Sequence, residues 1–107
     1  MKHGRLETMV KGWFVGAFEP SMVKSRDCEV AVKHYRTGER ESAHLHRVAT
    51  EITAIVIGRV RMMGREWCAG DIVVVEPGEA TDFEVLEDSV TVVVKLPCIL
   101  GDKYPAA

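Results

Sequence analysis

The sequence predicts an all-β protein, built as a small sandwich or barrel. Val and Ile together number 21 residues against 5 Leu, and this bias toward β-branched side chains is typical of sheets. The apolar residues fall in short runs between turn-forming residues, and no longer stretch has helical periodicity. Strands are expected at residues 12–18, 29–36, 43–46, 51–57, 59–62, 65–68, 71–75, 82–86 and 90–96.

The first two expected strands differ in their patterns. Residues 13–18 are apolar with little alternation, as in a strand that is buried on both faces. In the second strand Val30 and Val32 share a face with His34, so we expect His34 to point inward and Lys33 and Tyr35 outward. An inward His34 is either a hydrogen-bonded part of the cavity wall, which we favour, or a general acid or base.

The next two strands carry the most informative residues of the chain. His44 and His46 stand two residues apart in a strand and therefore share a face. Glu51 begins the following apolar run, in which Thr53, Ile55 and Ile57 share its face. A short turn between the two strands would bring the carboxylate beside both imidazoles, at a spacing that can close on one divalent metal ion.

The second half of the chain contains several turn signals. Gly58 can supply a bend, Met63-Gly64 can close a tight hairpin, and Pro77-Gly78 fits the centre of a type II turn. Residues 87–89 are expected to form the last hairpin. The strand before it should place Thr81, Phe83 and Val85 on one face, and the tail 101–107 should be loosely held.

Two motifs resemble those of the cupin superfamily, whose members are small β-barrels. In the first, Gly38 is followed after five residues by His44-x-His46, after four more by Glu51, and after six more by Gly58, so that this motif is complete. In the second, Gly70 and Gly78 fall in place. Three other positions of the family pattern hold different residues. Glu76 stands at the Pro position, with Pro77 one residue later, Thr81 stands at the His position, and Val85 stands at the Asn position.

This resemblance implies a cupin-type double-stranded β-helix, or jelly-roll barrel. The expected domain organisation is one cupin domain over residues 1–107, with a barrel core at about 28–97 and an N-terminal strand segment at about 10–18. The resemblance also implies a divalent metal (Zn, Fe, Mn or Ni) held by His44, His46 and Glu51. The usual fourth ligand of the family is a His, and this chain has Thr81 at that position. A metal-free cavity, in which these three residues hydrogen-bond one another, is therefore the alternative. Edge strands of small cupins often pair across a two-fold axis, so the N-terminal segment resembles the contact element of a homodimer.

Composition limits the function classes. The 107 residues with a net charge of -2 give no long-range attraction to nucleic acid or to an anionic membrane. No apolar run approaches the roughly 18 residues that span a bilayer, and the N-terminus has no apolar stretch of a signal peptide, so we expect a cytoplasmic protein. Three widely spaced cysteines do not indicate a disulfide framework.

These observations leave two hypotheses about the function. The first is a metal-dependent enzyme that acts on a small molecule, such as a sugar or a small acid. In this enzyme His34 and Glu51 would be the catalytic candidates, and Thr81, Phe83 and Thr53 would line the cavity. Arg36 and Arg47 would bind an anionic substrate at the barrel mouth. The second is a non-catalytic module that binds a small ligand, which the replacement at Thr81 favours.

Overall fold

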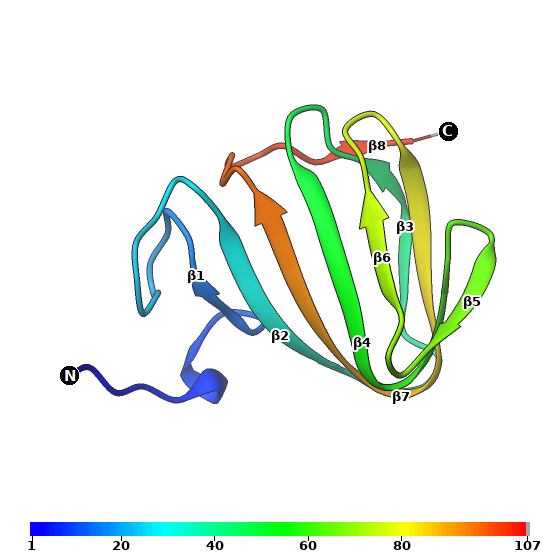
Figure 1. Ribbon diagram of the computed structural model, residues 1–107, viewed down its shortest axis with the longest axis horizontal. Helices are drawn as coiled ribbons and strands as arrows, with labels where there is room; N and C mark the ends of the chain where they lie inside the picture. The colour runs from blue at the N-terminus through cyan, green and yellow to red at the C-terminus, as the bar shows by residue number, and fades with distance from the viewer. Residues whose placement is uncertain (107) are drawn as a thin grey trace.

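The computed structural model describes residues 1–106, and Ala107, the last residue of the predicted tail, lies outside the described residues. One eight-stranded antiparallel sheet folds over on itself, so that two half-sheets face each other around the core (Figure 1). A 3-10 turn, η1 (Leu6–Thr8), precedes the strands. The strands are β1 (Trp13–Val15), β2 (Glu29–Tyr35), β3 (Arg40–Leu45), β4 (Thr50–Met62), β5 (Arg65–Cys68), β6 (Ile72–Val75), β7 (Ala80–Leu96) and β8 (Tyr104–Pro105).

Two long strands, β4 and β7, run through both half-sheets and bend between them (Figure 1). The first half-sheet has the order β1-β2-β7-β4-β6, and the second has the order β8-β3-β7-β4-β5. Gly58 permits the bend, because its φ is 92° and a Cβ there would lie 2.3 Å from both the Asp88 carbonyl oxygen and Ser89 Oγ. The bend predicted at Gly58 is therefore confirmed.

The predicted interruption of these long strands is wrong. The segments expected at 51–57 and 59–62 are one strand, and so are those expected at 82–86 and 90–96. Residues 87–89 do not form a hairpin, because Glu87 pairs with Arg59 of β4 and Ser89 pairs with Tyr35 of β2. Glu87 and Asp88 are exposed on the outside of a bent strand and do not mark its end.

The core lies between the half-sheets, and the bend changes which residues face it. Before Gly58 the odd-numbered Thr53 and Ile55 are buried, whereas after it the even-numbered Val60 and Met62 are buried. Ile57 is 57% exposed, so the prediction that it shares the inner face is wrong. The register shifts between β4 and β7 on either side of Ile57 are the cause. The main cluster comprises Ile55, Val60, Met62, Val73, Val75, Phe83 and Val85.

Strand β2 faces the opposite way from the prediction. Ala31 is buried, Lys33 and Tyr35 are half-buried, and His34 is exposed. The alternation of Val30 and Val32 was misleading, because the outer face of this half-sheet is apolar as well as the inner one. The inward orientation predicted for His34 is therefore wrong.

Two predicted turns are confirmed, and two predictions about the chain ends are wrong. Met63 and Gly64 have φ values of 54° and 70°, as in a type I′ hairpin. Gly78 has a φ of 87°, as the predicted type II turn requires. The tail is held in place by β8, which pairs with β3. The segment 13–18 is not buried on both faces, since all residues of β1 are half-buried.

Within residues 1–106, no helix is long and apolar enough to cross a membrane.

Candidate metal centre

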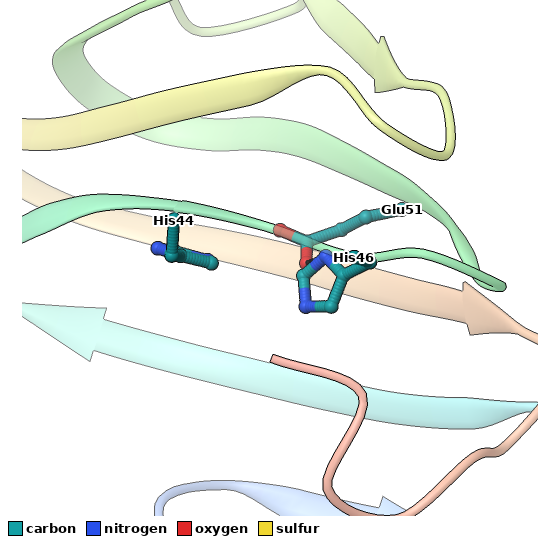
Figure 2. A group of neighbouring side chains, drawn as sticks. All are labelled: His44, His46 and Glu51. Atoms are coloured by element: carbon teal, nitrogen blue, oxygen red, sulfur yellow. Dashed lines mark ion pairs between the residues drawn. The ribbon is translucent and has the colours of Figure 1, made fainter. Parts of the chain in front are cut away.

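His44, His46 and Glu51 come together at one end of the space between the half-sheets. His44 belongs to β3, His46 follows the last residue of β3, and Glu51 is the second residue of β4. One potential ligand atom from each lies within 4.8 Å of the others. Figure 2 shows the Glu51 carboxylate beside the His46 ring, with His44 further along the same ribbon. The two rings are nearly perpendicular, with centroids 5.4 Å apart.

A bulge in β3 sets the direction of His44. Glu41 pairs with Phe83 and His44 pairs with Thr81, so three steps along β3 match two steps along β7. Phe83 and Thr81 are on the inner face of β7, so both Glu41 and His44 are brought to the inside. Glu41 was not predicted at the site, because the spacing of three residues in a regular strand would place it on the opposite face from His44.

The short loop between His46 and Glu51 is held by the C-terminal segment. The buried Asp102 accepts hydrogen bonds from the backbone N–H groups of Arg47 at 2.9 Å, Val48 at 3.1 Å and Ala49 at 2.9 Å. Burial alone would raise the pKa of Asp102, but these three hydrogen bonds outweigh burial and lower the pKa. Asp102 therefore fixes the loop that sets the spacing of two of the three candidate ligands.

Burial and charge keep His46 neutral near pH 7. The residue is 5% exposed, and burial, aided by the Lys95 ammonium and by His44, lowers the pKa of His46 to about 4. Burial raises the pKa of Glu51, and the Lys95 ammonium opposes that rise. Lys95 pairs in register with Glu51 and is a further charged residue beside the cluster. A neutral imidazole is the form that binds a metal ion.

The unused nitrogen atoms fit a metal ion. His44 Nδ1 lies 3.1 Å from the Ser42 carbonyl oxygen, which leaves its Nε2 free. His46 Nδ1 lies 3.6 Å from Glu51 Oε2, too far for a hydrogen bond, and the buried His46 Nε2 has no partner within residues 1–106. The alternative in which the three residues hydrogen-bond one another is therefore not what the structure shows. Two imidazoles and one carboxylate suit Zn, Fe, Mn or Ni.

A small cavity adjoins the cluster. Its volume of about 30 Å³ suits one water molecule or one ion. The predicted residues Thr53, Thr81 and Phe83 line it, together with Glu41 and Thr91. The Thr81 hydroxyl donates to the Asp82 carbonyl at 2.7 Å and accepts from the Met63 N–H at 2.9 Å, so backbone groups take up its proton and one of its two lone pairs. The fully buried Thr91 Oγ1 has no partner within the described chain.

The other predicted site residues lie outside this cavity. His34 is exposed and lines a separate surface groove. Arg36 is exposed, and Arg47 is exposed with its guanidinium 4.0 Å from the centroid of the Tyr104 ring. None of the three is among the residues that line this cavity.

The fold is that of the cupins. An uncharacterized conserved protein with a double-stranded β-helix domain from Klebsiella pneumoniae has a TM-score of 0.63 at 24% identity, over 68% of this chain and 66% of that chain. A cupin protein from Bacteroides fragilis has a TM-score of 0.58 at 22% identity, over 76% of this chain and 73% of that chain. The bacterial pirin YhhW from Escherichia coli, in complex with nickel(II), has a TM-score of 0.69 at 19% identity, over 82% of this chain and 39% of that chain.

The chain thus spans about two thirds to three quarters of the first two proteins and less than half of the third. No protein-family model and no curated protein matches the sequence. The predicted all-β class and the predicted double-stranded β-helix are confirmed.

Proposed function

Because the chain has the fold of the cupins, we propose that it binds a divalent metal ion through His44, His46 and Glu51 and acts on a small molecule there. The observation that carries this proposal is the buried His46 Nε2, which has no hydrogen-bond partner within residues 1–106. An unpaired buried polar atom costs about 1–3 kcal/mol, which a metal ion would offset. The nickel(II) complex of the similarly folded pirin supports the choice of a metal.

The residues of this chain would have distinct tasks. His44 and His46 bind as neutral imidazoles, Glu51 binds as a carboxylate, and Asp102 holds the loop between them. When bound, a divalent metal supplies Lewis-acid polarisation of a carbonyl or hydroxyl oxygen, and iron would add reactivity toward O₂. Glu41 lines the cavity and makes no ion pair within the described chain, so it is the second carboxylate that can exchange a proton with a substrate.

Metal content tests this proposal. Protein purified without an affinity tag should take up about one equivalent of Zn, Mn, Fe or Ni, and both His44→Ala and His46→Ala should lose it. Far-UV circular dichroism of the two variants serves as the control for folding. Failure of the folded parent to bind any of the four metals would remove the proposal.

A non-catalytic ligand-binding module is the second candidate. The observation that favours it is Thr81, because a hydroxyl that is hydrogen-bonded to two backbone groups is a poor transition-metal ligand in place of a fourth imidazole or carboxylate. Such a module would keep its affinity for a small ligand after treatment with a chelator. An enzyme would lose turnover in His46→Ala while retaining its fold.

We also propose that the protein forms a homodimer through the outer face of the first half-sheet. This valine face lies on β2, β7, β4 and β6, carries no charged residue in the rows that face one another, and exposes Val56, Ile72 and Val74 to solvent. The segment expected to mediate dimerisation contributes β1 at the edge of the same half-sheet. The valine face comprises Val30, Val32, Ile52, Ala54, Val56, Ile72, Val74, Val92 and Val94.

A further inference from the structure

A surface groove lies where the N-terminal segment packs against the barrel. Residues around η1 and the turn at Lys11 make one wall, and the ends of β2 and β3 make the other. Figure 1 shows η1 below β1, beside the lower part of β2. The groove has a volume of about 690 Å³, within the range of small-molecule sites. Its apolar lining comprises Leu6, Met9, Val32, Tyr35 and Phe83.

The groove lies directly against the metal cavity. Tyr35, Glu41 and Phe83 line both spaces, so only their side chains separate the groove from the cavity that His44 and Glu51 also line. The Tyr35 and Phe83 rings have centroids 5.0 Å apart and form an aromatic part of this wall. A molecule in the groove would therefore lie one side-chain layer from the candidate metal ligands.

Most charged groups of the groove are already engaged. Glu7 pairs with Arg5, Arg40 pairs with Glu84, and Glu39 Oε1 accepts a hydrogen bond from the Arg36 N–H. Lys11, Lys33 and Glu41 make no ion pair or side-chain hydrogen bond within residues 1–106. The groove charges that no ion pair neutralises are thus two ammonium groups, Lys11 and Lys33, and two carboxylates, Glu39 and Glu41, of which Glu41 also lines the metal cavity.

Lys33 is the more informative of the two lysines. It is half-buried, and its Nζ lies 5.0 Å from the centroid of the Trp13 ring. Burial lowers the pKa of Lys33, with Glu41 acting in the opposite direction. A half-buried ammonium group that makes no ion pair within residues 1–106 is costly, and an anionic ligand in the groove would add to the partial compensation that Glu41 gives it.

Lys11 is held in a conformation that favours glycine. Its φ is 51°, in a tight turn closed by a 3.0 Å hydrogen bond from the Trp13 N–H to the Val10 carbonyl. A non-glycine residue in the left-handed region is strained. Strained residues of this kind often lie at binding sites.

We propose that this groove binds a small organic acid, with its carboxylate at Lys33 and Lys11 and its apolar body on Tyr35 and Phe83. The acid is the substrate class of the metal centre, an assignment that rests on the proposed function. In this arrangement the far end of the acid lies against Glu41, at the wall of the metal cavity.

Fluorescence of Trp13 provides the test. The chain has 2 Trp residues, so Trp67→Phe leaves Trp13 as the only reporter, 5.0 Å from the Lys33 ammonium. We expect saturable binding of 3-phenylpropionate to the metal-free protein, and binding of the neutral 3-phenylpropionamide at least about 10-fold weaker. Lys33→Gln in the same background should weaken binding of the acid by about 10-fold or more. Lys24→Gln, which removes an exposed lysine paired with Glu19, should have no effect.

Lys11→Gly gives a second, opposite readout. It should weaken binding of the acid and at the same time raise the thermal midpoint, because it removes the lysine and the strained φ together. Equal affinity for acid and amide, or unchanged affinity in Lys33→Gln, would overturn the inference. Because the binding assay needs no metal, metal uptake without acid binding would overturn this inference alone. Acid binding without metal uptake would overturn only the proposed function and its link to the groove.

Discussion

Asp102 is the residue on which the geometry of the candidate metal centre most depends. Its carboxylate accepts from three consecutive N–H groups of the loop that separates His46 from Glu51. Asp102→Asn should cost about 1.5–3 kcal/mol of unfolding free energy, because an amide offers these donors one oxygen and no charge. It should also weaken Zn²⁺ affinity by about 10- to 100-fold, as loss of a supporting contact commonly does.

Urea unfolding and competition with a chromogenic chelator measure the two effects. Asp82→Asn is the matched control, since Asp82 is exposed on β7 and touches neither the loop nor the cavity. Unchanged Zn²⁺ affinity in a folded Asp102→Asn variant would show that the loop does not need this support.

His46 should make the metal-free protein sensitive to acid. The pKa of His46 is about 4 in the folded protein against an ordinary 6.5, so the unfolded chain binds more protons between these values. The free energy of unfolding should therefore fall as pH drops from 6.5 toward 4, by on the order of 2 kcal/mol. The raised pKa of Glu51 acts in the opposite sense above its ordinary value of 4.5 and partly offsets this loss.

Urea titrations of the chelator-treated protein at several pH values measure how the free energy of unfolding changes with pH. This change should be markedly smaller in His46→Gln. If parent and variant lose stability equally on acidification, His46 is not the responsible group.

At the scale of single residues, alternation within strands predicted the cluster of His44, His46 and Glu51 but not the residues around it. His44, His46 and Glu51 are brought together as expected, because two are close in one strand and the third begins the next. Glu41 could not be predicted, since a bulge has no signal in the sequence. Asp102 could not be predicted either, because its contact with the loop spans more than fifty residues of chain.

Among the elements, the bend shared by β4 and β7 decides the shape of the sheet. Gly58 combines a φ of 92° with a site where a Cβ would meet the Asp88 carbonyl and Ser89 Oγ. Gly58→Ala should therefore destabilise the protein by at least about 3 kcal/mol, the sum of backbone strain and displacement of β7.

Gly64→Ala is a matched control for this prediction. Gly64 also has a positive φ, 70°, but nothing lies near a Cβ built there. Its substitution should cost only the strain, about 1–2 kcal/mol. Thermal or urea unfolding compares the two, and equal losses would mean that the contact between β4 and β7 at Gly58 is not tight.

The sequence predicted the turns of these elements better than their continuity or their orientation. Glycines at 58, 64 and 78 mark real bends and turns, because positive φ values favour glycine. Strands β4 and β7 were divided in the prediction because a bent strand exposes polar residues much as a hairpin does. The orientation of β2 was reversed in the prediction because its two valines, Val30 and Val32, occupy its outer face.

For the whole molecule, the valine face predicts association of two copies into a homodimer. Ile72, on the edge strand β6 of that face, is 66% exposed, and a two-fold axis would place the uncharged rows of two copies against each other. Sedimentation should give about twice the chain mass of 11.9 kDa for the parent and the monomer mass for Ile72→Lys. Ile99→Lys is the control, because Ile99 is 41% exposed but lies outside the valine face. A monomeric parent at micromolar concentration would contradict the proposed homodimer.

The central claim is that His44, His46 and Glu51 hold a metal ion. The most direct measurement is elemental analysis of untagged protein, before and after loading with Zn, Mn, Fe or Ni, beside His46→Ala. We predict about one metal ion per chain in the parent and none in the folded variant. A folded parent that binds no metal, or a variant that binds as much as the parent, would contradict the account. The cluster would then be a polar lining of a ligand-binding barrel.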